Sequence, residues 1–208
     1  MTTEQPRVWV VDDESDVLEG LTLLLRSADY PVVPCRGGRE LLDRLDEEST
    51  GCIVLDLRMP DMGGLEVQRE LGRRGCRIPV VFLSGHGDIP IAVEAIRAGA
   101  VDFLEKPVRD KQLFASVERA LDEDRRRQAE ATDRGEARDL LDSLSPREAE
   151  VADLILEGLK TAEIAERLGL SPRTVEMHRA RLLRRLGART SAEAVRIIEE
   201  ARNLATQD

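Results

Sequence analysis

Short apolar runs alternate with amphipathic stretches through the first 121 residues of the chain. The stretches between the runs place apolar residues three or four positions apart, as at Leu18, Leu21 and Leu25. Strands that alternate with helices in this way predict a parallel sheet covered by helices on both faces. The five apolar runs lie at Val8–Val11, Val32–Val33, Cys52–Leu55, Pro79–Leu83 and Val101–Leu104.

The predicted fold of this part is therefore α/β, with short connections that leave few possible topologies. The flavodoxin-like order, in which the strands of a (βα)5 unit are arranged 2-1-3-4-5, is the usual one at this length. The run at Cys52–Leu55 is wholly apolar, which is expected of a strand that is buried on both faces.

Polar side chains stand where four of the runs end. They are Asp12 and Asp13, Asp56, Ser84 and Lys106. Because the carboxyl ends of parallel strands meet at one edge of a sheet, we expect these side chains to converge. Neighbouring carboxylates repel one another unless a cation lies among them. The oxygen donors of this set favour Mg²⁺.

A magnesium ion beside a nucleophilic carboxylate suits phosphoryl transfer. We expect Asp56 to be the nucleophile and to form an aspartyl phosphate. Lys106 would pair with one phosphoryl oxygen, and Ser84 would donate a hydrogen bond to another.

Residues 5–124 resemble the receiver domain of bacterial two-component response regulators. The resemblance implies that a sensor histidine kinase phosphorylates Asp56 and that Ser84 and Phe103 act as a coupled switch. It also implies a cis peptide bond between Lys106 and Pro107, since only bonds to proline adopt the cis form at low cost. The matching residues are Asp12-Asp13, Asp56, Met59-Pro60, Ser84, Phe103 and Lys106-Pro107.

The same resemblance implies a set of magnesium ligands. Asp13, Asp56 and the backbone carbonyl of Arg58 would bind the ion directly, and Asp12 would act mainly through water. Arg58 and His86 stand near the expected approach of water to the phosphate. For His86, an exposed loop position is the preferred interpretation.

Charge is divided unevenly along the chain. Residues 1–124 carry 15 Lys and Arg against 25 Asp and Glu, whereas residues 125–208 carry 16 of each. Opposite charges recur four positions apart in the segment 122–143, as at Asp122 and Arg126, which favours a solvated helix. We therefore predict a receiver at 1–121, a charged helical linker at 122–143 and a second domain at 144–208.

Localisation is predicted from what the sequence lacks. No apolar run is long enough to span a membrane, and the N-terminus does not resemble a secretion signal. The three cysteines are an odd number and lack a metal-binding spacing, so buried reduced thiols in a cytoplasmic protein are expected.

The apolar pattern of residues 144–208 predicts four short helices separated by glycine turns. The segment 172–189 carries six arginines and one acidic residue. On a helical projection, Val175, Leu182 and Leu186 face inward and the arginine-rich face is exposed. An exposed basic face is typical of a helix that reads the major groove of DNA.

Residues 144–198 resemble the LuxR-type helix-turn-helix domain of the FixJ/NarL family. The match runs through Leu144–Glu148, Glu163–Ala165, Leu168, Ser171–Val175, His178 and Leu186-Gly187. It implies a support helix at 161–168, a recognition helix at 172–186 and a dimer contact at 191–202. Base edges would meet Glu176, Met177 and Ala180, and phosphates would meet Arg173, Thr174, His178, Arg181 and Arg184.

The combined interpretation is a phosphorylation-dependent transcription regulator rather than an enzyme. Its expected partners are a histidine kinase, promoter DNA, a second copy of the chain and RNA polymerase. One alternative is a DNA-binding regulator that responds to a signal other than phosphate. Another is an Asp-nucleophile phosphatase of the haloacid dehalogenase type, which is expected to have a second Asp where Arg58 stands. A dinucleotide enzyme is disfavoured because no Gly-x-Gly-x-x-Gly follows the first run.

Overall fold

The computed structural model describes residues 6–85 and 89–206. The chain divides into two compact units, Met1–Arg127 and Gln128–Asp208, and each unit has its own hydrophobic core. Among the helices that the structure describes, none is both long and apolar enough to cross a membrane.

The first unit is built on a parallel sheet of five strands in the order β2-β1-β3-β4-β5. This is the flavodoxin-like order, so the predicted fold class is confirmed. Every residue of β3 is buried, in agreement with its apolar sequence. The strands are β1 Arg7–Val11, β2 Val32–Cys35, β3 Gly51–Asp56, β4 Val80–Ser84 and β5 Asp102–Glu105.

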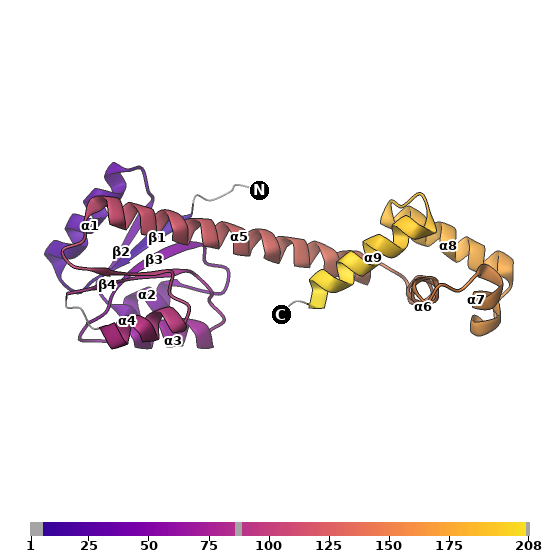
Figure 1. Cartoon of the computed structure of the whole chain (residues 1–208), viewed down its shortest axis with the longest axis horizontal. Helices are drawn as coiled ribbons and strands as arrows, with labels where there is room; N and C mark the ends of the chain where they lie inside the picture. The colour runs from indigo at the N-terminus through magenta and orange to yellow at the C-terminus, as the bar shows by residue number, and fades with distance from the viewer. Residues whose placement is uncertain (1–5, 86–88, 207–208) are drawn as a thin grey trace. The chain divides into compact units, whose positions relative to one another are not determined.

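Helices cover both faces of this sheet (Figure 1). Leu18 and Leu25 of α1 and Leu113 and Val117 of α5 pack with one set of alternate strand residues. Helices α2, α3 and α4 cover the other face, where the fully buried Phe82 lies. The helices are α1 Ser15–Ser27, α2 Gly38–Arg44, α3 Gly64–Arg73, α4 Ile89–Arg97 and α5 Asp110–Asp142.

Helix α5 continues well beyond the 110–121 segment whose apolar residues indicated a helix. It runs through the charged segment and through Gly135 to Asp142 without a break. The charged pairs of that segment, such as Asp122 with Arg125, are therefore neighbours on one continuous helix.

A buried carboxylate attaches this extension of α5 to the sheet. Asp124 is fully buried, and its Oδ2 accepts a hydrogen bond of 2.7 Å from the backbone N–H of Gly51 at the start of β3. Its Oδ1 lies 2.5 Å from the guanidinium of Arg127. Gly51 has a φ of +110°, and a Cβ there would lie 1.9 Å from the carbonyl oxygen of Arg7. Glycine is thus required at the position that Asp124 binds.

We expect Asp124→Ala to destabilise the first unit by about 1–3 kcal/mol, because the Gly51 N–H would remain buried without this partner. The matched control is Asp122→Ala, which removes an exposed carboxylate that pairs only across the helix surface. Urea unfolding followed by circular dichroism measures both variants. Equal midpoints for the two variants would contradict a specific role for Asp124.

The second unit contains four short helices and the end of α5. Leu140 and Leu141 of α5 pack against the core formed by α6, α8 and α9. Val151, Ile164 and Val175 lie in a second cluster that joins α6, α7 and α8. The helices are α6 Pro146–Leu156, α7 Thr161–Leu168, α8 Pro172–Leu186 and α9 Ser191–Thr206.

Helix α6 begins at a complete capping box. The Ser145 N–H and hydroxyl both donate to Oε2 of Glu148, at 2.9 and 2.8 Å, and the Glu148 N–H donates back to the Ser145 hydroxyl. Glu148 is buried, and Arg185 of α8 lies 3.5 Å from the same oxygen. The hydrogen bond from the Ser145 backbone is the largest cause that lowers the pKa of Glu148, and it outweighs the effect of burial.

A lowered pKa in the folded state means that the Glu148 carboxylate stabilises the second unit above the unfolded-state pKa, which is near 4.5. We therefore expect Glu148→Gln to lower the melting temperature by an amount that is constant above about pH 5 and that shrinks as the pH falls further. The control is Glu150→Gln on the same helix, where the carboxylate is half-buried and pairs with the exposed Arg147. If the melting temperature of Glu148→Gln stayed below that of the wild-type protein by the same amount down to about pH 3, this mechanism would be contradicted.

Candidate functional site

Two buried carboxylates lie side by side at the carboxyl edge of the sheet. In the register of β1 and β3, Val11 is paired with Leu55. Asp12 and Asp56 directly follow these two residues, so they lie next to each other where the two neighbouring strands end. Asp12 is 1% exposed and Asp56 is 6% exposed. Carboxylates this deeply buried require partners.

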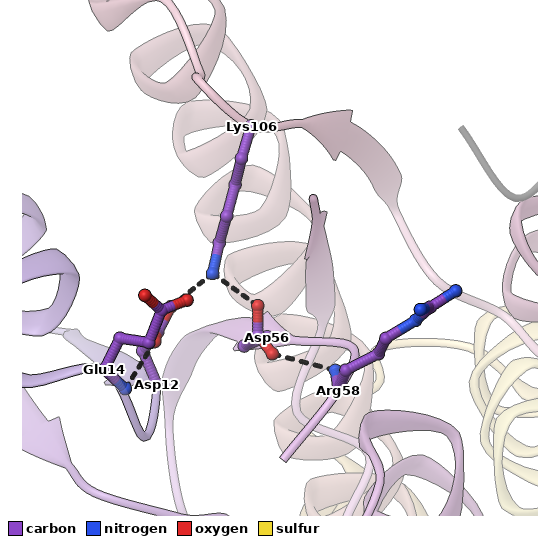
Figure 2. Close-up of polar contacts among 5 residues, drawn as sticks. All are labelled: Asp12, Glu14, Asp56, Arg58 and Lys106. Carbon is purple, nitrogen blue, oxygen red and sulfur yellow. Dashed lines mark hydrogen bonds and ion pairs between the residues drawn. The ribbon is translucent and has the colours of Figure 1, made fainter. Parts of the chain in front are cut away.

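Lys106 supplies the partner for both carboxylates. Its Nζ lies 2.7 Å from Oδ2 of Asp12 and 2.5 Å from Oδ1 of Asp56, as Figure 2 shows. The backbone N–H of Lys106 donates to the carbonyl of Ser84 at 2.7 Å, which fixes the start of the Lys106 side chain next to β4. The Lys106–Pro107 peptide bond is cis, as expected.

The second oxygen of each carboxylate accepts a backbone hydrogen bond. The Glu14 N–H donates to Oδ1 of Asp12 at 2.9 Å, and the Arg58 N–H donates to Oδ2 of Asp56 at 2.8 Å. Both carboxylates are therefore oriented by a backbone turn on one side and by Lys106 on the other (Figure 2).

Burial is the largest single influence on the pKa of Asp12 and on that of Lys106. It raises the pKa of Asp12 above its usual value, against the opposing hydrogen bonds from Lys106 and from the Glu14 N–H. Burial also acts to lower the pKa of Lys106, but the hydrogen bonds to Asp12 and Asp56 outweigh it and the pKa lies above its usual value. A charged ammonium between the two carboxylates is the result.

The structure brings some of the predicted metal ligands into direct contact, and one of them is exposed. Asp12 and Asp56 share Lys106, and Arg58 is joined to Asp56 through its backbone. Asp13 is exposed. In the described part of the chain, no three His, Cys, Asp or Glu side chains form a group that could hold a metal ion. Lys106 lies between two of the carboxylates that such a group would use.

Ser84 and Phe103 lie on neighbouring strands next to this cluster. Ser84 is 1% exposed at the end of β4 and is paired with Glu105 of β5. Phe103 of β5 is half-buried, and its ring centroid lies 6.3 Å from that of Phe82. His86, the other position considered near the phosphate, lies outside the described residues.

A polar contact beside Phe103 was not predicted. Asp102 accepts hydrogen bonds from its neighbour's N–H, from the buried hydroxyl of Ser116 on α5 and from Arg119. It therefore links the start of β5 to α5. The contact joins residues 14 and 17 positions apart across two elements, so no local sequence pattern could have indicated it.

Helix α8 presents the exposed face that the projection predicted. Val175, Leu182 and Leu186 are buried, as expected. The side chains on the opposite face are exposed, and Met177 retains 42% of its accessible area. The exposed residues are Arg173, Glu176, Met177, Ala180, Arg181 and Arg184.

Two further predicted DNA contacts are partly buried. The Thr174 hydroxyl and N–H both contact the hydroxyl of Ser171, the N-cap of α8. The Nδ1 atom of His178 is buried and has no hydrogen-bond partner among the described residues. Thr174 therefore takes part in the capping of α8, and His178 is less accessible to DNA than the exposed arginines of the same helix.

Comparisons with known proteins agree with both parts of this description. The family model of the response regulator receiver domain matches residues 8–118. The model of the bacterial regulatory proteins of the luxR family matches residues 142–198. The two matches leave the middle of α5 between them.

Individual relatives match nearly the whole chain. Nodulation protein W of Bradyrhizobium diazoefficiens is 40% identical over 192 residues, which are 92% of this chain and 85% of that protein. The transcriptional regulatory protein FixJ of Rhizobium meliloti is 39% identical over 190 residues, which are 91% of this chain and 93% of that protein. The solved structure of the response regulator StyR is 38% identical and gives a TM-score of 0.88, covering 95% of this chain and 100% of that one. The chain therefore belongs to the two-component response regulators that combine a receiver domain with a LuxR-type DNA-binding domain and regulate transcription.

Proposed function

We propose that Asp56 accepts a phosphoryl group from a sensor histidine kinase and that this modification controls binding to promoter DNA. The observation that carries the proposal is the pairing of Asp56 and Asp12 around Lys106 at the carboxyl edge of the sheet. A nucleophile needs an opening to its substrate, and the edge of the sheet is where open α/β folds provide one.

In the proposed transfer, a carboxylate oxygen of Asp56 attacks the phosphorus of a phosphohistidine. The bond between phosphorus and nitrogen breaks, and the imidazole leaves after taking up a proton. Lys106 Nζ is already 2.5 Å from Oδ1 of Asp56, so a small movement lets the ammonium pair with a phosphoryl oxygen. The backbone N–H of Arg58 holds the other oxygen of Asp56 during this step.

The oxygen donors around Asp56 suit a hard divalent cation such as Mg²⁺. We propose that Asp12, Asp13, Asp56 and the backbone carbonyl of Arg58 hold it, with Asp12 acting mainly through water. When bound, the ion offsets negative charge on the phosphoryl oxygens. Asp12 and Asp56 are both paired with Lys106, whereas Asp13 is exposed. We therefore propose that Asp13 is the ligand that a cation from solvent reaches first.

The proposed response to phosphorylation passes from Ser84 to Phe103. The buried Ser84 hydroxyl would move toward the phosphate, and the half-buried Phe103 ring, which lies beside Phe82, would change its position in response. Such a step is a two-state equilibrium that the new charge biases.

The exposed apolar side chains of α4 support dimerisation as the output. Ile89, Val93 and Ile96 are 73%, 45% and 47% exposed, and large exposed apolar groups on one helix indicate a protein contact. We propose that a second copy covers this face and that the 122–143 segment sets the spacing of the two DNA-binding domains. We also propose that the protein acts in the cytoplasm and contacts RNA polymerase. In this role it is a regulator and not an enzyme.

We expect wild-type protein incubated with acetyl phosphate and Mg²⁺ to gain the mass of one phosphoryl group, and Asp56→Asn to gain none. An amide at this position is similar in size but cannot act as the carboxylate nucleophile. Intact-mass spectrometry measures the gain. A control receiver domain is incubated under the same conditions. If the control were phosphorylated and the wild-type protein were not, the alternative of a regulator that responds to a different signal would be favoured.

Magnesium binding is expected to depend on the exposed acid as well as on the buried pair. Asp13→Asn should weaken the Mg²⁺ affinity by at least about tenfold, because one of the anionic oxygen ligands is lost. Isothermal titration calorimetry measures the affinity, with Asp16→Asn in α1 as the control for loss of one nearby charge. Equal affinities for the two variants would exclude Asp13 as a ligand.

Arg181→Ala should weaken binding to all DNA sequences alike and reduce the dependence of log affinity on log salt by about one unit. The reason is that an exposed arginine of α8 is expected to contact a phosphate rather than a base. Arg147→Ala, an exposed arginine of α6, is the control and should leave the salt dependence unchanged. Fluorescence anisotropy over a salt series measures both, and an unchanged slope for Arg181→Ala would remove it from the interface.

A further inference from the structure

The recognition helix contains one arginine that differs from its neighbours. Arg179 has a side chain that is only 22% exposed, whereas Arg181 and Arg184 of the same helix are exposed. Both terminal nitrogens of Arg179 are bound within the protein. A phosphate contact of the kind expected of the exposed arginines is therefore not the role of Arg179.

The guanidinium of Arg179 joins the starts of two other helices to α8. Its NH1 donates to the Thr161 hydroxyl at 2.6 Å, and its NH2 donates to the Ser191 hydroxyl at 2.7 Å. Thr161 is the first residue of α7 and Ser191 is the first residue of α9. A planar guanidinium with several donors is suited to hold two acceptors at once, which an ammonium does less well.

This contact determines the direction of a third hydrogen bond. The Thr161 hydroxyl lies 2.5 Å from Oε1 of Glu176. A guanidinium can only donate, so the Thr161 oxygen accepts from Arg179 and its single proton is left for Glu176. Arg179 thus donates to Thr161, and Thr161 in turn donates to the Glu176 carboxylate, which is the final acceptor.

The relay engages only one oxygen of the exposed Glu176 carboxylate. Glu176 is 59% exposed, and the contacts from Thr161 and from Arg179, at 2.5 and 3.8 Å, both involve Oε1. A carboxylate accepts hydrogen bonds and donates none. In the major groove its complement is an exocyclic amine, on cytosine or adenine. The positive charge of Arg179 also reduces the repulsion between this carboxylate and the DNA phosphates.

We propose that Arg179 is a positioning residue for sequence recognition, which acts through Thr161 to hold the Glu176 carboxylate toward a base amine. The proposal rests on the proposed DNA-binding function. It assigns to Arg179 and Thr161 a role in the choice of base at one position of the operator, rather than in affinity for the DNA backbone.

The test uses the full-length chain and duplexes selected from a random library by the wild-type protein. Affinities are measured for the selected duplex, for its single-base substitutions and for an unrelated duplex. Glu176→Gln identifies the base position that Glu176 reads, because only there should the preference change. Failure of the wild-type protein to select any sequence would contradict the proposed function rather than this inference.

Thr161→Val and Arg179→Met should reduce discrimination at that one position by about tenfold, the loss expected when a base-reading contact is misplaced. Affinity for the unrelated duplex should change by less than about twofold, because the phosphate contacts remain. In a Glu176→Ala background, the same two substitutions should have no further effect on discrimination, since the group that they position is absent.

Ser191→Ala is the matched control, because it removes the other contact of Arg179 and leaves the relay to Glu176 intact. It should resemble Thr161→Val in melting temperature but retain wild-type discrimination. Thr161→Val alters no charge and keeps the test available if Arg179→Met does not fold. The proposal would be overturned if Thr161→Val lowered affinity equally for every duplex, or if its effect persisted in the Glu176→Ala background.

Discussion

The first unit depends on one ammonium group held between two buried carboxylates. Without Lys106, the carboxylates of Asp12 and Asp56 would face each other at the end of adjacent parallel strands, in a region too buried for water to separate their charges. Each of the three side chains comes from a different strand end, so the pairing forms only when the sheet is complete. The proposed phosphoacceptor is thus a product of the fold, and its contact with Lys106 connects it to Ser84 of β4 through the Lys106 backbone.

The second unit uses charge in the opposite way. Arg173, Arg181 and Arg184 are exposed on one face of α8, where an anionic partner can reach them. The buried carboxylate of Glu148 pairs with the partly exposed Arg185, and this ion pair joins α6 to α8. Arg179 stands between these two uses. It is partly buried like a structural residue, yet its contacts lead to an exposed carboxylate. The separation of exposed and internal arginines allows affinity and sequence choice to be altered independently.

Local patterns predicted more of this molecule than long-range contacts did. The bounds of α8 at 172–186 follow from Ser171 and Pro172 at the start and Gly187 in a left-handed conformation at the end, and all of these can be read in the sequence. The strand order followed from alternation together with the usual topology at this length. The helix over 122–143 was predicted as a charged linker, and the structure shows it as a continuous part of α5. The hydrogen bond between Asp124 and Gly51 was not indicated, because the two residues are 73 positions apart. The Thr161–Glu176 contact was not indicated either, since it joins two helices whose packing the hydrophobic pattern does not specify.

The central claim is that phosphate on Asp56 controls binding to DNA. The most direct measurement is the affinity of the full-length protein for a selected duplex, by fluorescence anisotropy, with and without acetyl phosphate in the presence of Mg²⁺. We predict that the phosphodonor raises the affinity of the wild-type protein by about tenfold, within the range of typical coupling between sites, and leaves Asp56→Asn unchanged. An equal rise in Asp56→Asn, or no rise in wild-type protein that is phosphorylated on Asp56, would contradict the account.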